Sequence, residues 1–475
     1  MSKTPRPASS NNRLLWLVAI GFFMETLDST IVNTALPSMA VSLGESPLLM
    51  QSVVIAYSLT IAVFIPASGW IADRFGTRNV FLSAIALFTL GSLCCALSQT
   101  LPQLVISRVL QGIGGAMLMP VGRLAVLRAF PHQEFLRAIS FVTIPALIGP
   151  LIGPTLGGWL VQYASWHWIF LINIPVGIIG CIATYVDMPD IRGPENTKFD
   201  LAGFVMLSVS MVMISFALDG LSELGFQHAT VLMLLIFGLA ALTSYWLHAS
   251  KHEKPLFSLR LFKSATYSIG LLGNLFARIG SSSMPFLIPL FLQISMRYSP
   301  FEAGMTMIPV ALAGIYAKRL ATPLILRLGY RRTLVYNTLC VGIAMASFAL
   351  ITPHQPLWIR IIQLLFFGTV NSLQFTAMNT LTLKDLETRL ASSGNSLFSM
   401  IQMLAMSFGV ATAGALLSTF SQHYPGTQEG SMALEAFRAT FICMGVITCS
   451  SAFIFHQLPT ELKSTGKDQQ AVTVE

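Results

Sequence analysis

Long apolar runs constrain the fold of this chain more than any other feature. A helix that crosses a bilayer needs about 20 mostly apolar residues. About fourteen runs meet this requirement, and they lie at residues 14–36, 50–71, 79–98, 102–124, 137–160, 168–187, 201–219, 229–249, 267–292, 303–322, 332–352, 357–380, 395–418 and 436–456. No soluble domain fits between them. The pattern predicts an all-α polytopic membrane protein.

Composition supports this prediction and excludes a large soluble core. Charged residues make up 10% of the 475-residue chain and hydrophobic residues 54%, whereas soluble domains carry about 25% charged residues. So few charges cannot solvate the exterior of a soluble protein. The net charge of +8 does not indicate nucleic-acid binding, because the basic residues are spread among short loops rather than gathered on one face.

The placement of basic residues predicts the topology. If the N-terminus is in the cytoplasm, the only basic residues on or near the outer side of the membrane are Arg297, Arg360 and Arg438. This asymmetry is what the positive-inside rule expects. An even number of spans then places both termini in the cytoplasm. The first apolar run is longer than a signal-peptide core and has no clear cleavage site, so we expect it to remain as the first span.

A short internal repeat divides the chain into halves. Residues 74–78 read RFGTR and residues 327–331 read RLGYR, and each follows the second span of a six-span block. Duplicated halves around a midplane site are typical of transporters. We therefore predict a cytoplasmic tail at 1–13, a six-helix half at 14–187, a linker with two extra helices at 188–266, a second half at 267–456 and a cytoplasmic tail at 457–475.

No metal or disulfide pattern is visible. The six cysteines all fall in apolar runs without metal-type spacing, so we interpret them as small buried hydrophobic residues. His248 and His252 are four residues apart at a helix end beside Lys251, which favours a membrane-interface cluster over a metal site. We predict no metal ligands.

Charged residues inside the spans are the first candidates for function. Glu25 and Asp28 lie within FFMETLDSTIVNTALP, and Arg108 lies within LVISRVLQGIGGA. Each such charge costs roughly 2.5–3.5 kcal/mol on insertion scales. Glu25 and Asp28 are three residues apart, so they point to one side of a helix. Two interpretations of Asp28 stay open: proton coupling or substrate contact, and a structural ion pair with Arg108.

Span nine carries a second polar group. Its sequence, GNLFARIGSSSMPFLIPLFLQ, places Asn274 and Arg278 one helical turn apart, ahead of glycine, serine and proline residues that interrupt the helix. Interrupted helices with polar groups often mark the midplane site of a transporter. Span nine is the repeat partner of span one, so acids of one half are expected to face an arginine of the other. Alternatively, Arg278 extends to a membrane interface.

Two further motifs have simple physical interpretations. The loop GWIADRFGTRNVF at 69–81 is consistent with a positive-inside loop that contains packing and turn glycines. The segment IPALIGPLIGPTLGG at 144–158 is consistent with a kinked helix in which small residues allow close crossing.

Together these motifs resemble those of the major facilitator superfamily. The loop at 69–81 is similar to its signature loop, which implies a gating role; the residues concerned are Gly69, Asp73, Arg74, Gly76 and Arg78. The second copy has Leu326 in place of Asp73. The segment at 144–158 resembles the antiporter motif of exporters through Gly149, Pro150, Gly153, Pro154, Gly157 and Gly158. Arg108, Gln111 and Gly112 resemble the fourth-span motif, whose arginine is linked to proton transfer.

The resemblance extends to one branch of the superfamily and covers nearly the whole chain. LDSTIVNTALP, WHWIFLINIP at 166–175 and LASSGNS at 390–396 look like the fourteen-span drug:proton antiporters. This implies a multi-pass protein of the bacterial inner membrane that exports small molecules in exchange for protons, and that is driven by the proton gradient without a cofactor. The expected coupling and substrate residues are Asp28, Glu25, Arg108, Gln111, Asn274 and Arg278. Because one chain holds both halves, a monomer suffices.

Several alternatives are weighed against this expectation. Arg108 and Arg278 could bind an anionic metabolite or a metal–carboxylate chelate instead of a drug. An enzyme is disfavoured, because no metal-spaced histidines and no nucleophile motif occur, and a P-loop for ATP is absent. A receptor or scaffold without transport is disfavoured because the loops are too short for an output domain.

Overall fold

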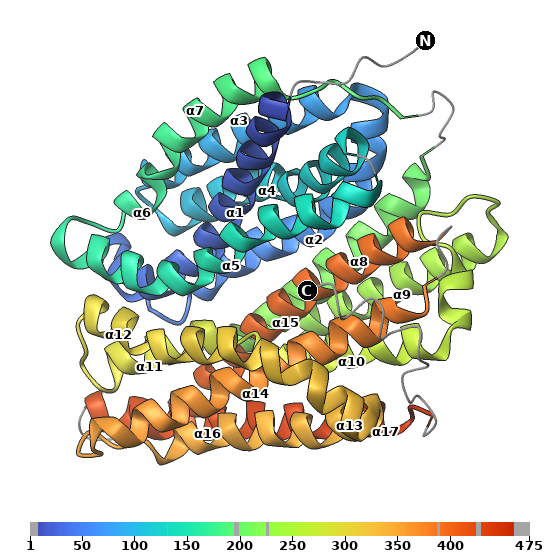
Figure 1. Cartoon of the computed structure of the whole chain (residues 1–475). Helices are drawn as coiled ribbons and strands as arrows, with labels where there is room; N and C mark the ends of the chain where they lie inside the picture. The colour runs from blue at the N-terminus through green and yellow to red at the C-terminus, as the bar shows by residue number, and fades with distance from the viewer. Residues whose placement is uncertain are drawn as a thin grey trace, which may run out of the picture. The chain divides into compact units, whose positions relative to one another are not determined.

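The computed structural model describes residues 8–130, 132–193, 199–224, 228–386, 390–423 and 429–459. Over these residues the chain is helical and contains no strand, so the predicted all-α class is confirmed (Figure 1). Most of the predicted tails at 1–13 and 457–475 lie outside the described residues.

The chain divides into two compact units, and each has its own set of helices. The first unit comprises Met1–Ala217, Leu232–Leu256 and Tyr298–Met305. Its helices are α1 (Ala8–Leu43), α2 (Gln51–Phe75), α3 (Thr77–Ala96), α4 (Leu101–Ala129), α5 (His132–Tyr163), α6 (Trp168–Leu171), α7 (Asn173–Asp187), most of α8 (Leu201–Leu224) and α9 (Ala229–Lys251), and nearly all of α12 (Pro300–Thr306).

The second unit comprises Leu218–Val231, Phe257–Arg297 and Thr306–Glu475. Its helices are η1 (Leu259–Lys263), α10 (Ala265–Ser281), α11 (Met284–Ile294), α13 (Ile308–Ser347), η2 (Phe348–Leu350), α14 (Leu357–Lys384), α15 (Ala391–His423), α16 (Glu429–Ser450) and α17 (Ala452–His456).

All fourteen predicted spans fall on helices. Among the described residues, twelve helices are long and apolar enough to cross a membrane. The two other predicted spans are 137–160, which lies within α5, and 303–322, which runs from α12 into the first part of α13. The helix α13 holds two predicted spans because only a kink at Gly329 separates them.

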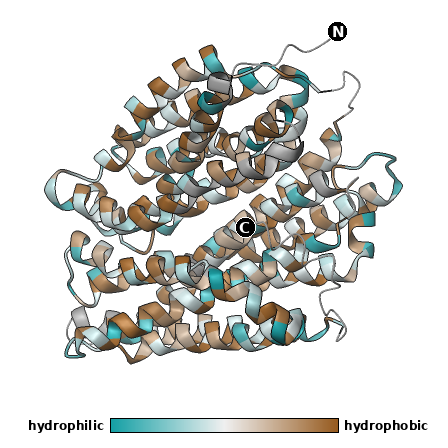
Figure 2. Cartoon of the chain, in the orientation of Figure 1, coloured by the Kyte–Doolittle hydropathy of each residue, from teal (hydrophilic) through white to brown (hydrophobic). Residues whose placement is uncertain are grey.

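The surfaces of the outer helices are apolar, as contact with lipid requires. Figure 2 shows hydrophobic residues along the helices and hydrophilic residues concentrated in loops and at helix ends. In α9, Ile236 is 63% exposed and Phe237 is 59% exposed. Contact of such a surface with water is unfavourable, whereas lipid tails are as apolar as these side chains. The chain is therefore a multi-pass membrane protein.

The backbone at the internal repeat supports the duplication. Gly76 of RFGTR has φ 91° and ψ 147°, and Gly329 of RLGYR has φ 75° and ψ 162°. Residues that carry a side chain rarely adopt a positive φ, which explains why glycine occupies both sites. The two copies thus share a backbone turn, although α13 is otherwise continuous.

Hydroxyl caps fix the starts of the two helices that carry the buried polar residues. Thr100 precedes α4 and accepts a hydrogen bond from the Gln103 amide at 3.4 Å, with a proline in the first turn. Ser264 precedes α10 and accepts from the Tyr267 amide at 3.4 Å. Such caps satisfy amides that have no partner within the helix. They define where α4 and α10 begin, and therefore the positions of Arg108 and Asn274 along these helices.

Candidate functional site

Asp28 and Arg108 form a buried ion pair in the first unit. Arg108 Nη1 donates to Asp28 Oδ2 at 2.6 Å. The side chains of Asp28 and Arg108 are 0% and 1% exposed, respectively. Asp28 comes from α1 and Arg108 from α4, so the pair ties together two helices far apart in sequence. The structure therefore contains the ion pair that the sequence left as one of two interpretations of Asp28.

Amide side chains complete the hydrogen bonds of the pair. Gln111 Nε2 donates to Asp28 Oδ1 at 2.8 Å, and Asn173 Nδ2 donates to the same oxygen at 3.2 Å. Both amides also donate to Ser92 Oγ, at 2.7 and 3.3 Å. Since Ser92 lies in α3 and Asn173 in α7, these hydrogen bonds join four helices around the pair. We call Asp28, Ser92, Arg108, Gln111 and Asn173 the Asp28 network.

The Arg108 guanidinium has further contacts beyond Asp28. Its Nη1 also donates to Gln111 Oε1 at 2.5 Å, and its Nε donates to the Val53 carbonyl at 3.3 Å. The ring of Tyr57 lies 4.0 Å from its central carbon, a cation–π distance. Loss of one partner from such a buried pair costs about 3–5 kcal/mol, because the other charge stays buried without compensation.

Glu25 lies one turn before Asp28 but has a different environment. It is 5% exposed, and its Oε2 atom has no hydrogen-bond partner among the described residues. The two acids predicted to share one side of the helix are therefore not equivalent: the Asp28 carboxylate has a full set of donors, whereas Glu25 keeps an unpaired oxygen.

Asn274 and Arg278 contact each other in the second unit. Arg278 Nε donates to Asn274 Oδ1 at 3.3 Å, and Asn274 Nδ2 donates to Thr382 Oγ1 of α14 at 3.2 Å. The Phe375 ring lies 4.0 Å from the guanidinium carbon of Arg278. Arg278 Nη2 has no hydrogen-bond partner within the described residues. The predicted interruption is present, since α10 ends at Ser281 and α11 begins at Met284.

Glu25 and Asp28 belong to the first unit and Arg278 to the second; that the acids of one half face the arginine of the other stays a prediction.

The loop at 69–81 is held by ion pairing at the end of α2. Asp73 forms an ion pair with Arg128 of α4, and the Asp73 carbonyl accepts from the Gly193 amide at 3.0 Å. Arg74 lies with its guanidinium carbon 5.4 Å from the Trp70 ring. Arg78 lies 5.9 Å from the ring of Tyr185. Asp73, Arg74 and Arg78 therefore contact three different elements.

The turn at Gly76 is bound to the segment that follows α7. Thr77 Oγ1 donates to the Pro189 carbonyl at 2.9 Å, and the Thr77 amide donates to the Ile191 carbonyl at 3.1 Å. A Cβ at Gly76 would meet the Asp190 carboxylate. Gly69 differs, because the space around it is open, and the close packing predicted there is not present. Gly76 is thus the glycine that this loop requires.

A stripe of glycines on α5 packs against a stripe of threonines on α1. The stripe residues are spaced four apart on each helix, and each glycine has one threonine as its neighbour; the pairs are Gly149 with Thr26, Gly153 with Thr30, and Gly157 with Thr34. A Cβ at any of the three glycines would clash with α1. Close crossing is therefore the role of these residues in the structure (Figure 1).

The other motif residues on α5 follow the same logic. The helix runs without a break through Pro150 and Pro154. Proline is tolerated in membrane helices because neighbouring groups can satisfy the backbone carbonyls that it leaves without a partner. Gly158 lies against Pro300 at the start of α12, and Gly304 of α12 lies against the Pro154 carbonyl. The antiporter-like motif is thus a packing surface for α1 and α12.

Two histidines of the linker, His248 and His252, form a small polar cluster with Asp200. His248 Nε2 lies 2.8 Å from Asp200 Oδ1, and ligand atoms of Asp200, His248 and His252 lie within 4.8 Å of one another. The Asp200 oxygens also accept from the amides of Gly203 at 2.9 Å and Leu256 at 3.1 Å. The carboxylate therefore caps α8 and anchors the end of the linker, so its lone pairs are largely committed to these donors.

Sequence reasoning missed three contributors to the site. Asn173 and Tyr57 contact the Asp28–Arg108 pair, and Ser92 accepts from Gln111 and Asn173, yet none of the three was singled out as a site residue. Asn173 gave a usable signal, because it is an amide inside the apolar run WHWIFLINIP. Ser92 and Tyr57 gave none, since single hydroxyl residues are common in membrane helices.

The profile of the Major Facilitator Superfamily matches residues 18–410. The chain belongs to the major facilitator superfamily. It is a secondary transporter of this superfamily.

Relatives in the superfamily match the chain over nearly its full length. It is 54% identical over 447 residues to the "Putative multidrug resistance protein MdtD" of Pectobacterium atrosepticum, which covers 94% of this chain and 96% of the relative. The protein of the same name from Serratia proteamaculans is 53% identical, with 94% and 93% covered.

Solved transporter structures share the fold at low identity. A D-xylose–proton symporter has a TM-score of 0.67 and 15% identity, with 96% of this chain and 99% of that chain covered. A bacterial homologue of the lysosomal transporter Spinster has a TM-score of 0.68 and 15% identity, with 95% and 97% covered. At such identity these structures show the fold alone.

Proposed function

We propose that this transporter exports structurally varied drugs across the bacterial inner membrane in exchange for protons, without an enzymatic step and without a cofactor. The observation that carries the proposal is the 54% identity, over 94% of the chain, to a relative described as a multidrug resistance protein. Buried carboxylates at Glu25 and Asp28 supply groups that can bind protons or cationic compounds. The partners are the substrate, protons and the lipid bilayer, and the chain acts as a monomer.

The contacts of the two acids support different roles. Asp28 accepts three hydrogen bonds, including one from Arg108. Its protonation would leave the guanidinium uncompensated in an apolar interior, which is costly. Glu25 has an unpaired oxygen, so proton binding there breaks no ion pair. We therefore assign proton exchange to Glu25 and the positioning of Arg108 to Asp28.

Proton flux in sealed proteoliposomes that carry a pH gradient tests this proposal. A cationic drug is added to the wild type, Glu25→Gln, Asp28→Asn and, as a matched control, Glu45→Gln, since Glu45 is an exposed acid. We expect the drug to dissipate the gradient through the wild type and the control, and at least tenfold more slowly through Glu25→Gln. A variant Asp28→Asn that folds like the wild type and loses coupling, beside an active Glu25→Gln, would reverse the two roles.

A second candidate substrate class is an anionic metabolite or metal–carboxylate chelate. Arg278 favours it, because its Nη2 atom has no hydrogen-bond partner among the described residues and the sequences of α10, α11, α13 and α14 contain no acid. The same vesicles with citrate and its magnesium chelate in place of the drug test this class. If the chelate dissipates the gradient and the cationic drug does not, and if the Arg278→Gln variant no longer responds to the chelate, the protein is an anion exporter.

A further inference from the structure

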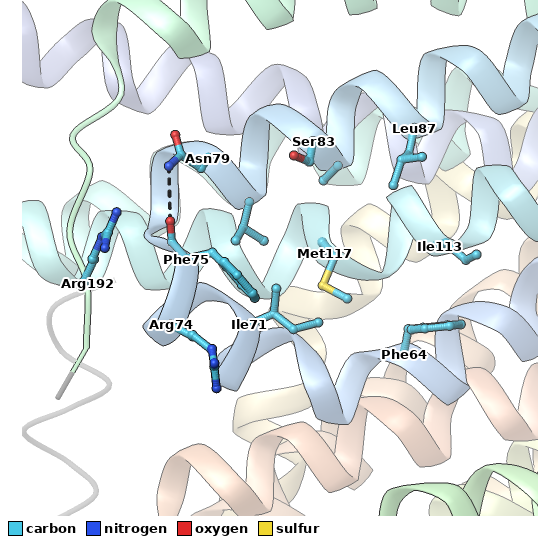
Figure 3. A pocket seen from close by; sticks show the side chains of 12 residues that line it. Phe64, Ile71, Arg74, Phe75, Asn79, Ser83, Leu87, Ile113, Met117 and Arg192 are labelled. Carbon is cyan, nitrogen blue, oxygen red and sulfur yellow. Dashed lines mark hydrogen bonds between the residues drawn. The ribbon is translucent and has the colours of Figure 1, made fainter. Parts of the chain in front are cut away.

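A cavity in the first unit combines an apolar slot with two arginines at one end. It has a volume of about 500 Å³ and lies between α2, α3 and α4. Figure 3 shows Arg74, Asn79 and Arg192 at one end of this cavity. None of the contacts in the Asp28 network involves these residues. The cavity is therefore separate from the buried ion pair.

The opposite part of the cavity is apolar. Phe64 and Ile71 of α2, Leu87 of α3, and Ile113 and Met117 of α4 line it, and Figure 3 shows them extending away from the arginines. Phe64 and Arg74 are ten residues apart on α2, which corresponds to about 15 Å along a helix. This is about half of the roughly 30 Å hydrocarbon core. The slot thus has the depth of one lipid leaflet.

The charge at the mouth suits a phosphate. Arg74 and Arg192 are both exposed, and arginine binds phosphate oxygens through two parallel N–H groups. The acids nearby offset only part of this charge. Asp73 is paired with Arg128, and Asp190 forms a long ion pair with Arg192, with Oδ2 3.9 Å from Nε. The mouth therefore keeps a net positive charge.

The surroundings of the slot suit lipid rather than water. Phe75 at the mouth is 52% exposed, and Leu90 farther along α3 is 50% exposed. The positive-inside rule places the end that carries Arg74 at the cytoplasmic face. Basic pockets between membrane helices on that side are suited to lipid headgroups.

We propose that this cavity binds one anionic phospholipid of the cytoplasmic leaflet, with the phosphate at Arg74 and Arg192 and an acyl chain in the slot between α2, α3 and α4. The lipid would bridge α2 to the segment after α7, which is the segment that already binds the turn at Gly76. This inference requires only that the chain spans a membrane, and it holds for any transported substrate.

Native mass spectrometry of the detergent-purified chain tests the proposal by titration with phosphatidylglycerol and, separately, with zwitterionic phosphatidylethanolamine. We expect the wild type to bind phosphatidylglycerol at least tenfold more tightly. The double variant Arg74→Gln/Arg192→Gln should bind the two lipids equally. A charge-matched control is Arg260→Gln/Arg327→Gln, because both arginines are exposed and lie outside the cavity; this control should bind like the wild type.

Two further arms distinguish the lipid from other occupants. Ser83 lines the slot and is exposed, so Ser83→Trp should fill it and weaken phosphatidylglycerol binding at least fivefold without a change of charge. Inorganic phosphate at millimolar concentration should not displace the lipid. Displacement by phosphate, normal binding by Ser83→Trp, or an equal loss in the charge-matched control would each overturn the proposal.

Discussion

The first and second units both bury arginines in membrane helices, but they neutralise them differently. In the first unit, Arg108 pairs with the carboxylate of Asp28. In the second unit, Arg278 contacts an amide and an aromatic ring. Arg360, which is 6% exposed, donates to the Gln355 carbonyl at 2.7 Å. Helices α10, α11, α13 and α14 offer these arginines no acid of their own.

Arg108 and Arg360 differ in their partners although they lie in similar sequences. Arg108 is followed three residues later by Gln111 in the fourth span of the first half, and Arg360 is followed by Gln363 in the fourth span of the second. Gln111 donates to Asp28, whereas Gln363 donates to the Ser347 carbonyl at 2.9 Å. The duplicated framework thus keeps an arginine and an amide in both halves. In the first half a carboxylate, Asp28, is added to the arginine and the amide, whereas α10, α11, α13 and α14 of the second half contain no carboxylate.

The largest test of this contrast removes one arginine from each half. Arg108→Leu leaves Asp28 buried and uncompensated, and we expect a loss of about 3–5 kcal/mol. Arg278→Leu leaves no buried carboxylate, so its loss should be about 1 kcal/mol, the scale of one hydrogen bond or cation–π contact. The midpoint of thermal unfolding in detergent, followed by tryptophan fluorescence, measures both.

The double variant Asp28→Leu/Arg108→Leu serves as the control, because it removes both charges together. It should be more stable than Arg108→Leu alone. Equal midpoints for Arg108→Leu and Arg278→Leu would show that the two halves do not differ in this respect.

An intermediate effect is expected at the two glycines that the halves share. Alanine at a strongly positive φ costs about 1–3 kcal/mol, so Gly76→Ala and Gly329→Ala should both lower the unfolding midpoint. Gly76→Ala should cost more, because its Cβ would also meet Asp190. Gly69→Ala is the matched control in the same motif. Open space surrounds Gly69 within α2, so alanine there should raise stability slightly. An unchanged midpoint for Gly76→Ala would contradict the role assigned to this turn.

Much of the fold could be predicted from the sequence because membrane helices have a strong local signal. Each run of about 20 apolar residues must be helical to satisfy its backbone in lipid, and all fourteen predicted spans fall on helices. The repeat was also readable, since RFGTR and RLGYR place a glycine at the same turn. The kink at Gly329 was harder, because the helix continues on both sides of it.

The site was predicted less completely. Asp28, Arg108 and Gln111 were found because charged and amide groups are rare in apolar runs. Their partners Ser92 and Tyr57 come from other helices, and only the packing brings them to the pair. The difference between Glu25 and Asp28 likewise depends on neighbours, and the helical spacing of the two acids carries no information about it. The crowding at Gly76 could not be distinguished from the open space at Gly69 either, because the loop pattern does not reveal which glycine is crowded.

The smallest effect is expected for a carboxylate outside the buried network, and it completes the comparison. Asp200 precedes α8 and accepts hydrogen bonds from Gly203, His248 and Leu256. Burial alone would raise the pKa of Asp200, but these hydrogen bonds hold that pKa below its ordinary value. Asp200→Ala removes a helix cap and should cost about 1 kcal/mol at neutral pH.

The dependence on pH follows from the direction of this shift. Because the pKa of Asp200 is lower in the folded state, its stabilisation is complete above the unfolded value of about 3.9 and is lost as the pH falls through the folded value. The difference in unfolding midpoint between Asp200→Ala and the wild type should therefore be constant from pH 8 to pH 5 and shrink only in stronger acid. Asp200→Asn retains a side-chain oxygen that can accept from Gly203, so it should lose less than Asp200→Ala. A difference that already vanished as the pH fell to about 6, well above the unfolded pKa of Asp200, would contradict the role assigned to this carboxylate.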